Sequence, residues 1–306
     1  MKLAVEFPSV AYREGPANVA RLAKGIEDIG YDQLDIFDHV VMGYDVDGRE
    51  KSIYPPKMPI LEAVAALSYM AAVTQRIGLG TEILVLPQRQ PVLVAKQFST
   101  LDILSGGRAR LGVGVGWQAS EFEALGERYE DRGRRTDQAI ELIRACWRDE
   151  RIDFKSESYT AIGMAMEPKS PQGAGLPIWI GGNKPVSLRR VGKYGDGWLA
   201  SRVADADFAS RAKDIIGEAA VAAGRDPDAI GWQCMIAPPP REGENDAKSF
   251  YTQPDRVAAR AVDLKAMGFE GVALNATMIF QSGSRSVDAI LDTLQILHDR
   301  LRAEVG

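Results

Sequence analysis

IGLGTEILVLPQRQPVLVAKQFSTLDILSGGRARLGVGVGW, residues 77–117, reads as a strand, a helix and a second strand. Strands are predicted at residues 77–86 and 108–117, where near-continuous apolar runs are typical of strands that are covered on both faces. A helix is predicted between them, at residues 90–104. This succession predicts parallel strands that are joined by a right-handed crossover.

The same alternation extends outward from this unit to both ends of the chain. Six further strands are predicted at residues 2–8, 31–38, 177–180, 197–201, 230–237 and 271–276. The other helices are predicted at residues 16–29, 60–74, 121–126 with 132–148, 185–194, 207–223, 255–267 and 287–301. Eight repeats in 306 residues favour a closed barrel over an open doubly wound sheet, since such barrels commonly take ~250 residues. We predict an α/β fold, a (β/α)8 TIM barrel, as one domain over residues 1–306 with insertions at its C-terminal mouth.

Composition and charge exclude several classes of function. Hydrophobic residues make up 45% and charged residues 26% of the chain, and the net charge is −5. Because no basic stripe is present, we expect no nucleic-acid partner. No run approaches the ~20 apolar residues of a membrane span, and the N-terminal strand-like run is too short for a signal peptide, so we expect a cytoplasmic protein without a membrane partner. Cys146 and Cys234 form no CxxC pattern and are expected to be buried thiols; no metal site is predicted.

Catalytic residues of such a barrel lie where strands lead into helices, and Asp38-His39 ends the second predicted strand. The chain has two histidines, and we interpret the other, His298, as a solvated residue of the last helix. His39 is a candidate for moving a proton or contacting a cofactor. Asp38 could fix its tautomer or anchor a cofactor ring. The alternative is a histidine that caps a strand end through its backbone.

The third predicted strand carries Glu82 inside an apolar run. A carboxylate that is buried without a partner is costly. Glu82 therefore either faces the barrel mouth, or lies where the strand is distorted, or forms a salt bridge with an arginine of another strand.

Glycines mark two further strand ends. GVGVGW (112–117) places glycines, including Gly114 and Gly116, on one face of the fourth strand, which leaves room either for a flat ligand or for tight packing. WIGGNKP (179–185) stands directly before a helix. Its residues 181–184 have the composition of a phosphate-binding turn, although an ordinary strand-to-helix turn is the alternative.

Two long loops, residues 39–59 and 238–254, follow strands and are expected to shape a substrate pocket at the mouth. The β-prone insert at residues 151–168 follows a helix instead. We expect it to form an auxiliary hairpin that approaches the mouth from outside.

Taken together, these segments resemble the luciferase-like monooxygenase superfamily, and within it the oxidoreductases that depend on the deazaflavin coenzyme F420. The segments are FDHVV (37–41), residues 80–117, EFEALG (121–126), RGRRTDQAIELIRACW (132–147), PIWIGGNKP (177–185) and YGDGW (194–198). The resemblance covers most of the chain up to about Ser201 and is weak beyond it.

The resemblance implies a dimeric TIM barrel that binds the cofactor ring at its C-terminal mouth. It further implies a non-prolyl cis peptide at Glu82-Ile83, in a strand bulge that backs the ring. Asp38 and His39 match a pair of residues near the ring. The phosphate-binding turn would consist of Gly181, Gly182, Asn183 and Lys184, with Ser201 on the neighbouring strand. Gly114, Gly116 and Trp117 complete the predicted cofactor site.

One departure concerns the substrate. Similar enzymes that oxidise sugar phosphates carry a glutamate acid at the position of Trp117, which puts that activity in doubt and favours a flatter, more apolar substrate. We interpret the protein as an oxidoreductase that transfers a hydride between F420 and a small organic substrate, with His39 handling the proton. The alternatives are a monooxygenase that uses reduced FMN and O2, a non-catalytic flavin-binding protein, and a barrel of unrelated chemistry.

Overall fold

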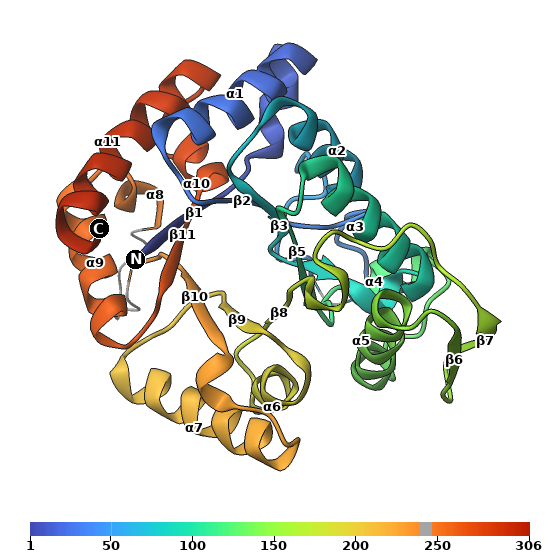
Figure 1. The fold of residues 1–306 in the computed structure, drawn as a ribbon. Helices are drawn as coiled ribbons and strands as arrows, with labels where there is room; N and C mark the ends of the chain where they lie inside the picture. Colours follow the sequence, from blue (N-terminus) through green and yellow to red (C-terminus); the bar gives the residue numbers. More distant parts are fainter. Residues whose placement is uncertain (50, 239–246) are drawn as a thin grey trace.

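The computed structural model describes residues 1–49, 51–238 and 247–306. Parallel strands form a barrel at its centre, and a ring of helices surrounds it (Figure 1). Around the barrel the strands are β3 (Gly78–Thr81), β2 (Gln33–Ile36), β1 (Lys2–Glu6), β11 (Gly271–Asn275), β10 (Gly231–Met235), β9 (Gly197–Ala200), β8 (Ile178–Gly181) and β5 (Ala109–Gly114). Because β3 also pairs with β5, the sheet is closed. The predicted (β/α)8 TIM barrel is therefore confirmed.

The outer helices begin and end close to their predicted limits. They are α1 (Pro16–Ile29), α2 (Ala63–Val73), α3 (Pro91–Ser105), α5 (Arg132–Arg148), α6 (Pro185–Tyr194), α7 (Ala206–Ala222), α9 (Pro254–Ala266) and α11 (Val287–Val305). Four of them begin with a proline, whose missing N–H costs nothing in the first turn. Among the helices that the structure describes, none has the length and hydropathy needed to cross a bilayer.

The third strand, predicted as one run of residues 77–86, is interrupted, and the non-prolyl cis peptide that the resemblance implied at Glu82-Ile83 is confirmed. The strand consists of β3 and β4 (Leu84–Val85), separated by this cis peptide. The Thr81 side chain bridges the interruption, because its hydroxyl donates to the carbonyl of Gly112 at 2.7 Å and accepts from the N–H of Gly112 at 3.1 Å. A side chain thus replaces backbone hydrogen bonds of the sheet.

Short helices also depart from the prediction. α10 (Ala276–Gln281) follows β11 directly, because the Asn275 side chain accepts from the N–H of Met278 at 2.8 Å and caps the helix. α4 (Ala119–Ala124) lies where a helical stretch was expected, and α8 (Ala247–Phe250) precedes α9. Residues 239–246 of the predicted mouth loop lie outside the described residues.

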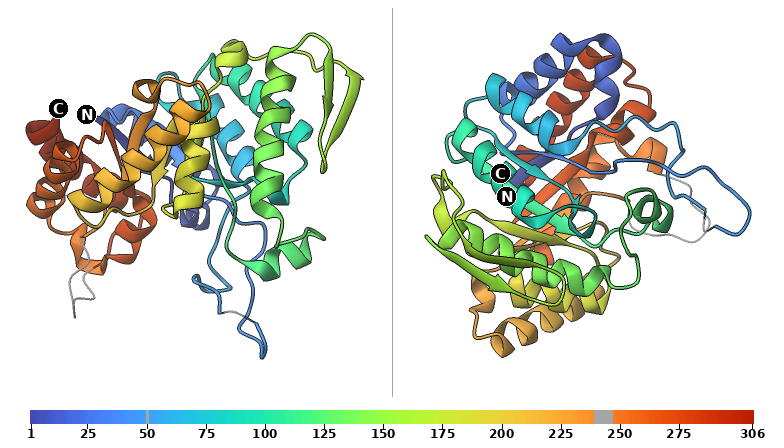
Figure 2. Two further views of the ribbon diagram at one scale, coloured as in Figure 1. Left: turned by 90° about the horizontal axis from the view of Figure 1, so that it is seen from below. Right: turned by 90° about the vertical axis from the view of Figure 1, so that its right-hand side faces the viewer.

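The insert forms the predicted hairpin, from β6 (Ile152–Lys155) and β7 (Thr160–Met164). It stands outside the ring of helices (Figures 1 and 2). Near its turn, the N–H of Ser158 donates to Gln138 at 3.0 Å and Glu157 pairs with Arg134 at 2.6 Å, and both partners belong to α5. The hairpin therefore lies outside the ring of helices, as expected, with its turn anchored on the first two turns of α5.

Glycines permit the close packing of the barrel interior. A Cβ atom at Gly112 would lie 1.8 Å from the carbonyl oxygen of Thr81 and 2.8 Å from Leu199. Lower in the barrel, Gly197 and Gly231 leave room for the ring of Trp179, and the Arg110 guanidinium lies 4.6 Å from that ring's centroid. The interior is therefore a packed core that opens only at its mouth.

We predict that Gly112→Ala lowers the free energy of unfolding by ~1–3 kcal/mol or more, the range for overpacked cores, because the Thr81 backbone must move. Urea unfolding measures this loss. Gly175→Ala is the matched control, since nothing lies within 4 Å of its added Cβ. Equal stability of the two variants would contradict the packing described for the barrel.

Candidate active site

The candidate site lies at the mouth of the barrel, on the side opposite the chain termini (Figure 2). The loop after β2 and helix α4 after β5 both project on this side. Parallel strands present their carboxyl ends together here, so residues that are distant in sequence converge. The site has a wall of aromatic rings, a buried histidine and a turn at the start of α6.

His39 pairs with a residue that the sequence analysis did not select. Its Nδ1 atom lies 2.9 Å from Oε2 of Glu121, in α4. The side chains of His39 and Glu121 are 5% and 0% exposed, so the pair is shielded from water. The other carboxylate oxygen of Glu121 accepts from the N–H of Val40 at 2.6 Å, and Gln88 donates to Oε2 at 3.1 Å.

These contacts determine the charge of Glu121 and the orientation of His39. Burial raises the pKa of Glu121, but hydrogen bonds from His39, Gln88 and Val40 outweigh it and leave the pKa below its usual value. An ionised Glu121 accepts a hydrogen bond from the N–H at Nδ1, so Nε2 is the ring nitrogen left for a ligand. No residue in the described structure is within hydrogen-bonding distance of Nε2.

Aromatic rings surround His39 on the mouth side. Trp117 and Tyr54 meet its ring edge-on, with centroids 5.4 and 5.8 Å away, and lie 6.0 Å from each other. Phe37 completes the group at 6.4 Å from His39. These contacts place the predicted site residue Trp117 in an aromatic wall beside His39, with the rings meeting edge-on.

Asp38 has a different role from the one that its position suggested. Its carboxylate accepts from the Arg89 guanidinium at 2.6 and 3.2 Å and from the N–H of Val85 at 3.1 Å. The expectation that Asp38 fixes the tautomer of His39 was wrong, because Glu121 occupies that position. Arg89 also pairs with Glu62 at 3.0 Å, the residue that caps α2. Asp38 therefore fastens the end of β2 to β4 and α2.

Glu82 belongs to a polar network inside the barrel. Its Oε2 atom accepts from the Gln233 amide at 3.0 Å, and the Gln233 amide oxygen accepts from Arg110 at 3.1 Å. Arg110 in turn pairs with Asp35 at 2.5 Å. The salt bridge that was considered for Glu82 is thus made by Asp35, and an amide links Glu82 to it.

Glu6 lies at the top of the same interior, where it accepts from Asn275 at 2.8 Å. Burial, and then the charge of Asp35, raise the pKa of Glu6 to about 8. Burial and the same neighbour also hold the pKa of Glu82 well above its usual value, although Arg110 opposes them. Carboxyl groups with raised pKa values are typical of functional sites.

The glycines of the mouth mostly accommodate protein. A Cβ atom at Gly114 would lie 1.9 Å from the Ile83 side chain, and one at Gly181 would lie 2.8 Å from it. Gly116 has a φ of +73° and faces Val85 and Phe122. The packing alternative therefore accounts for the space beside Gly114 and Gly116, and Ile83 presents the surface that a flat ligand would meet.

The turn before α6 fits an anion better. Gly182 has a φ of +117°, which favours glycine, and Trp198 donates to its carbonyl at 3.0 Å. Asn183 donates to the carbonyl of Arg202, while its buried Oδ1 atom has no partner. Lys184 and Ser201 are exposed. The predicted phosphate-binding residues thus lie together at a helix N-terminus, where N–H groups favour negative charge.

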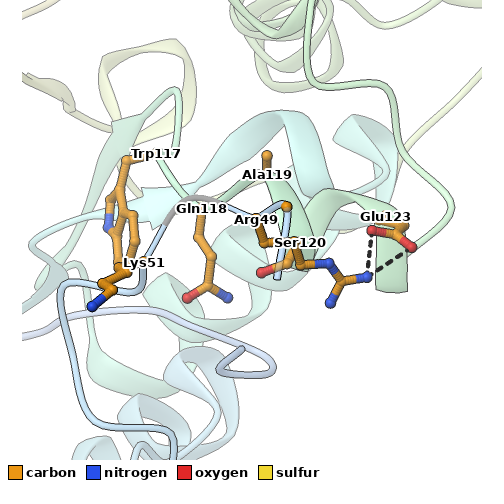
Figure 3. A pocket seen from close by; sticks show the side chains of 8 residues that line it. Arg49, Lys51, Trp117, Gln118, Ala119, Ser120 and Glu123 are labelled. Atoms are coloured by element: carbon orange, nitrogen blue, oxygen red, sulfur yellow. Dashed lines mark hydrogen bonds and ion pairs between the residues drawn. The ribbon is translucent and has the colours of Figure 1, made fainter. Parts of the chain in front are cut away.

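A pocket of about 190 Å³ opens beside Trp117, between α4 and the loop after β2 (Figure 3). Arg49 closes one side through an ion pair with Glu123, in which one guanidinium nitrogen donates to both carboxylate oxygens, at 2.8 and 3.0 Å. Lys51 and Gln118 line the rest. The pocket joins the aromatic wall to polar groups that could orient a small substrate.

Comparisons with known proteins identify the family. The family model described as luciferase-like monooxygenase matches residues 3–295, nearly the whole chain. The protein belongs to this family. Four solved structures with TM-scores of 0.70 to 0.76 share the fold at 16 to 20% identity.

Two relatives of this chain share one named activity. An F420-dependent glucose-6-phosphate dehydrogenase of Nocardia farcinica is 30% identical over 74% of this chain and 66% of its own length. The enzyme of the same name from Amycolatopsis mediterranei is 28% identical, over 65% and 57%. The chain thus spans two thirds or less of the length of these relatives.

Two of the structural neighbours have different named activities. An F420-dependent tetrahydromethanopterin reductase of Methanopyrus kandleri has a TM-score of 0.75 at 18% identity, covering 100% of this chain and 99% of that one. A monooxygenase of Streptomyces bottropensis has a TM-score of 0.76 at 20% identity and covers 100% of both chains. The fold is shared across both kinds of chemistry.

Sequence reasoning missed four residues of this luciferase-like site: Glu6, Arg89, Glu121 and Gln233. Glu121 lies within a segment that resembles the family, but nothing in the sequence around a glutamate of a short helix indicates that its side chain is buried. His298 was expected in solvent, yet its ring is half-buried and meets Tyr31 edge-on at 5.1 Å. Cys146 and Cys234 are buried free thiols, as predicted.

The raised pKa of Glu6 predicts how stability depends on pH. Glu6 titrates at 4.5 when unperturbed and at about 8 in the folded protein. Between these values the folded state retains a proton that the unfolded chain releases, so stability falls as pH rises, by up to about 1.4 kcal/mol per pH unit. Glu6→Gln keeps an acceptor for Asn275 and should reduce this slope.

Urea unfolding from pH 4.5 to 8 measures the slope. The control is Glu123→Gln, whose side chain is 67% exposed in the native protein. An identical slope in the wild type and in Glu6→Gln would contradict the assignment of the proton to Glu6.

Proposed function

We propose that this protein is an F420-dependent oxidoreductase, which transfers a hydride between the deazaflavin and a small organic substrate. The His39–Glu121 pair at the mouth of a luciferase-like barrel is the observation that carries this proposal. The F420-dependent relatives support the choice of cofactor. We also keep as predictions the single domain over residues 1–306, the homodimer and the cytoplasmic location.

The residues at the start of α6 fit the phosphate of such a cofactor. Gly182 leaves room that a side chain would fill, since a Cβ atom there would lie 2.9 Å from Ser187. The unpartnered Oδ1 atom of Asn183 can accept from a ligand hydroxyl. Gly181, Lys184 and Ser201 would complete the contacts. The tricyclic ring would then extend over Ile83 toward His39 and Trp117.

When bound, the deazaflavin supplies a ring carbon that accepts or donates a hydride. The protein orients the substrate against this carbon and excludes water. His39 holds or accepts the substrate proton at Nε2, and the ionised Glu121 stabilises the imidazolium that results. Asp38 positions His39 indirectly, by holding the end of β2. Trp117 and Tyr54 favour a flat, apolar substrate over a sugar phosphate.

The monooxygenase alternative is supported by the Streptomyces bottropensis enzyme, which has the same fold. Because deazaflavins carry carbon in place of N5 and react poorly with O2, oxygen uptake distinguishes the two chemistries. A non-catalytic flavin carrier would have no need of a buried acid–histidine pair beside an open pocket.

The decisive experiment is a fluorescence titration of the purified protein with F420 and, separately, with FMN. Tight binding of F420 with weak binding of FMN supports the proposal and justifies a screen of enones, nitroaromatics and alcohols. Tight binding of FMN alone, with substrate-dependent oxygen uptake, would replace the proposal with the monooxygenase alternative. Tight binding without turnover of any substrate class would favour a carrier.

Variants of the acid–histidine pair test its role. We expect His39→Ala to lower kcat about 10²–10⁴-fold, the usual contribution of a general acid or base, while the Kd for F420 stays within a few-fold. Glu121→Gln should lower kcat less, because an amide still accepts from Nδ1 but leaves the imidazolium without a counterion. Stopped-flow absorbance of the cofactor measures both.

Glu218→Gln is the control for Glu121→Gln, since Glu218 is an exposed carboxylate of α7, outside the candidate site. The proposed roles fail if the kcat of Glu121→Gln equals that of the control, or if His39→Ala keeps full turnover.

A further inference from the structure

Glu82 differs from the other members of the interior network in its access to the mouth. Asp35, Arg110 and Gln233 are 0%, 8% and 4% exposed, and Glu6 is 7% exposed. Glu82 is only half-buried and stands where β3 is interrupted. It is next to Ile83, the surface over which a flat ligand would lie. The network therefore reaches the binding site through the carboxyl group of Glu82.

The charges of this network do not balance. Glu6, Asp35 and Glu82 contribute three carboxyl groups, and Arg110 contributes the one guanidinium among the residues in contact with them. Arg110 already pairs with Asp35. A negative charge in a closed interior disfavours the ionisation of a neighbouring carboxyl group. Because Asp35 is paired with Arg110, Glu6 and Glu82 are the two carboxyl groups in which the protonated form is favoured.

Hydrogen bonding determines which oxygen of Glu82 would carry the proton. Oε2 accepts from the Gln233 amide at 3.0 Å. In a neutral carboxyl group, that leaves Oε1 as the O–H donor. No acceptor for Oε1 lies in the part of the chain that the structure describes. A donor at the edge of a binding site without a protein acceptor requires one from a ligand or from water.

We propose that Glu82 is protonated in the resting protein and donates a hydrogen bond from Oε1 to a carbonyl oxygen or ring nitrogen on the edge of the bound tricyclic ring. This inference rests on the proposed function. It makes Glu82 a residue that binds and positions the cofactor, separate from the proton handling of His39.

The surroundings of Glu82 determine how binding depends on pH. The titratable groups that act on it from the neighbouring elements are Glu6 of β1, Asp35 of β2, Arg110 of β5, Cys234 of β10, and Tyr251, before α9. Burial, Asp35 and Glu6 hold the pKa of Glu82 well above its usual value, and Arg110 opposes them. Affinity for the ring should be greatest below the raised pKa of Glu82 and fall as pH rises through it.

Fluorescence titrations with F420 between pH 5.5 and 9 test the proposal, on wild type, Glu82→Gln, Glu82→Ala and the control Glu218→Gln, which changes an exposed carboxylate of the outer helix α7. A glutamine keeps an N–H donor that does not titrate. We therefore expect Glu82→Gln to bind at every pH, without the loss of up to about tenfold per pH unit that linkage to one proton gives the wild type. Glu82→Ala should bind at least tenfold more weakly at low pH, and Glu218→Gln should follow the wild type.

Parallel slopes for wild type and Glu82→Gln, or an unchanged Kd for Glu82→Ala, would overturn the inference while leaving the proposed function intact. An infrared measurement on the cofactor-free protein tests the protonation of Glu82 independently of the proposed function. The absorption of a protonated carboxyl group should decrease in Glu82→Gln at neutral pH, and an unchanged band would refute the protonation. Failure of the wild type to bind F420 at any pH would overturn both the proposed function and the ring contact.

Discussion

Closure of the barrel depends on the absence of a side chain at Gly112. The carbonyl oxygen of Thr81 lies where a Cβ atom of residue 112 would be. The Thr81 hydroxyl makes hydrogen bonds with both the N–H and the carbonyl of Gly112. The third strand can therefore stop and resume within two residues. This interruption brings Glu82 into the interior and lays Ile83 across Gly114 and Gly181. The floor of the candidate site follows from one crowded contact between neighbouring strands.

Two carboxyl groups at this mouth, the buried Glu121 and the half-buried Glu82, have opposite protonation preferences. Glu121 receives hydrogen bonds from His39, Gln88 and Val40, and these donors compensate for its burial. Glu82 receives a hydrogen bond from Gln233 and faces the charge of Asp35. Burial raises the pKa of both groups, so the number of donors and the sign of the neighbouring charge decide the difference. The site thereby holds a base and an acid at the same pH.

The sequence predicted the fold well because the alternation of elements is a local pattern that repeats along the whole chain. It also placed His39, Trp117 and the turn from Gly181 to Lys184 correctly at the mouth, since position at a strand end is readable from order alone. It failed where side chains pair across elements. Asp38 precedes His39 but contacts Arg89, while Glu121 is 82 residues from the histidine that it contacts. The space beside Gly114 could not be assigned either, because Ile83 fills it from another strand.

The Arg89 guanidinium has a consequence for how this enzyme could diverge. It joins Asp38, at the end of β2, to Glu62, at the start of α2, so both ends of the intervening loop are fixed to one side chain. The entropy of closing such a loop grows only slowly with its length. Apart from His39 and Tyr54, which belong to the site, the segment between can therefore be lengthened, shortened or replaced at little cost to the barrel. That makes the loop an exchangeable module, through which selection could change the substrate while the cofactor machinery stays the same.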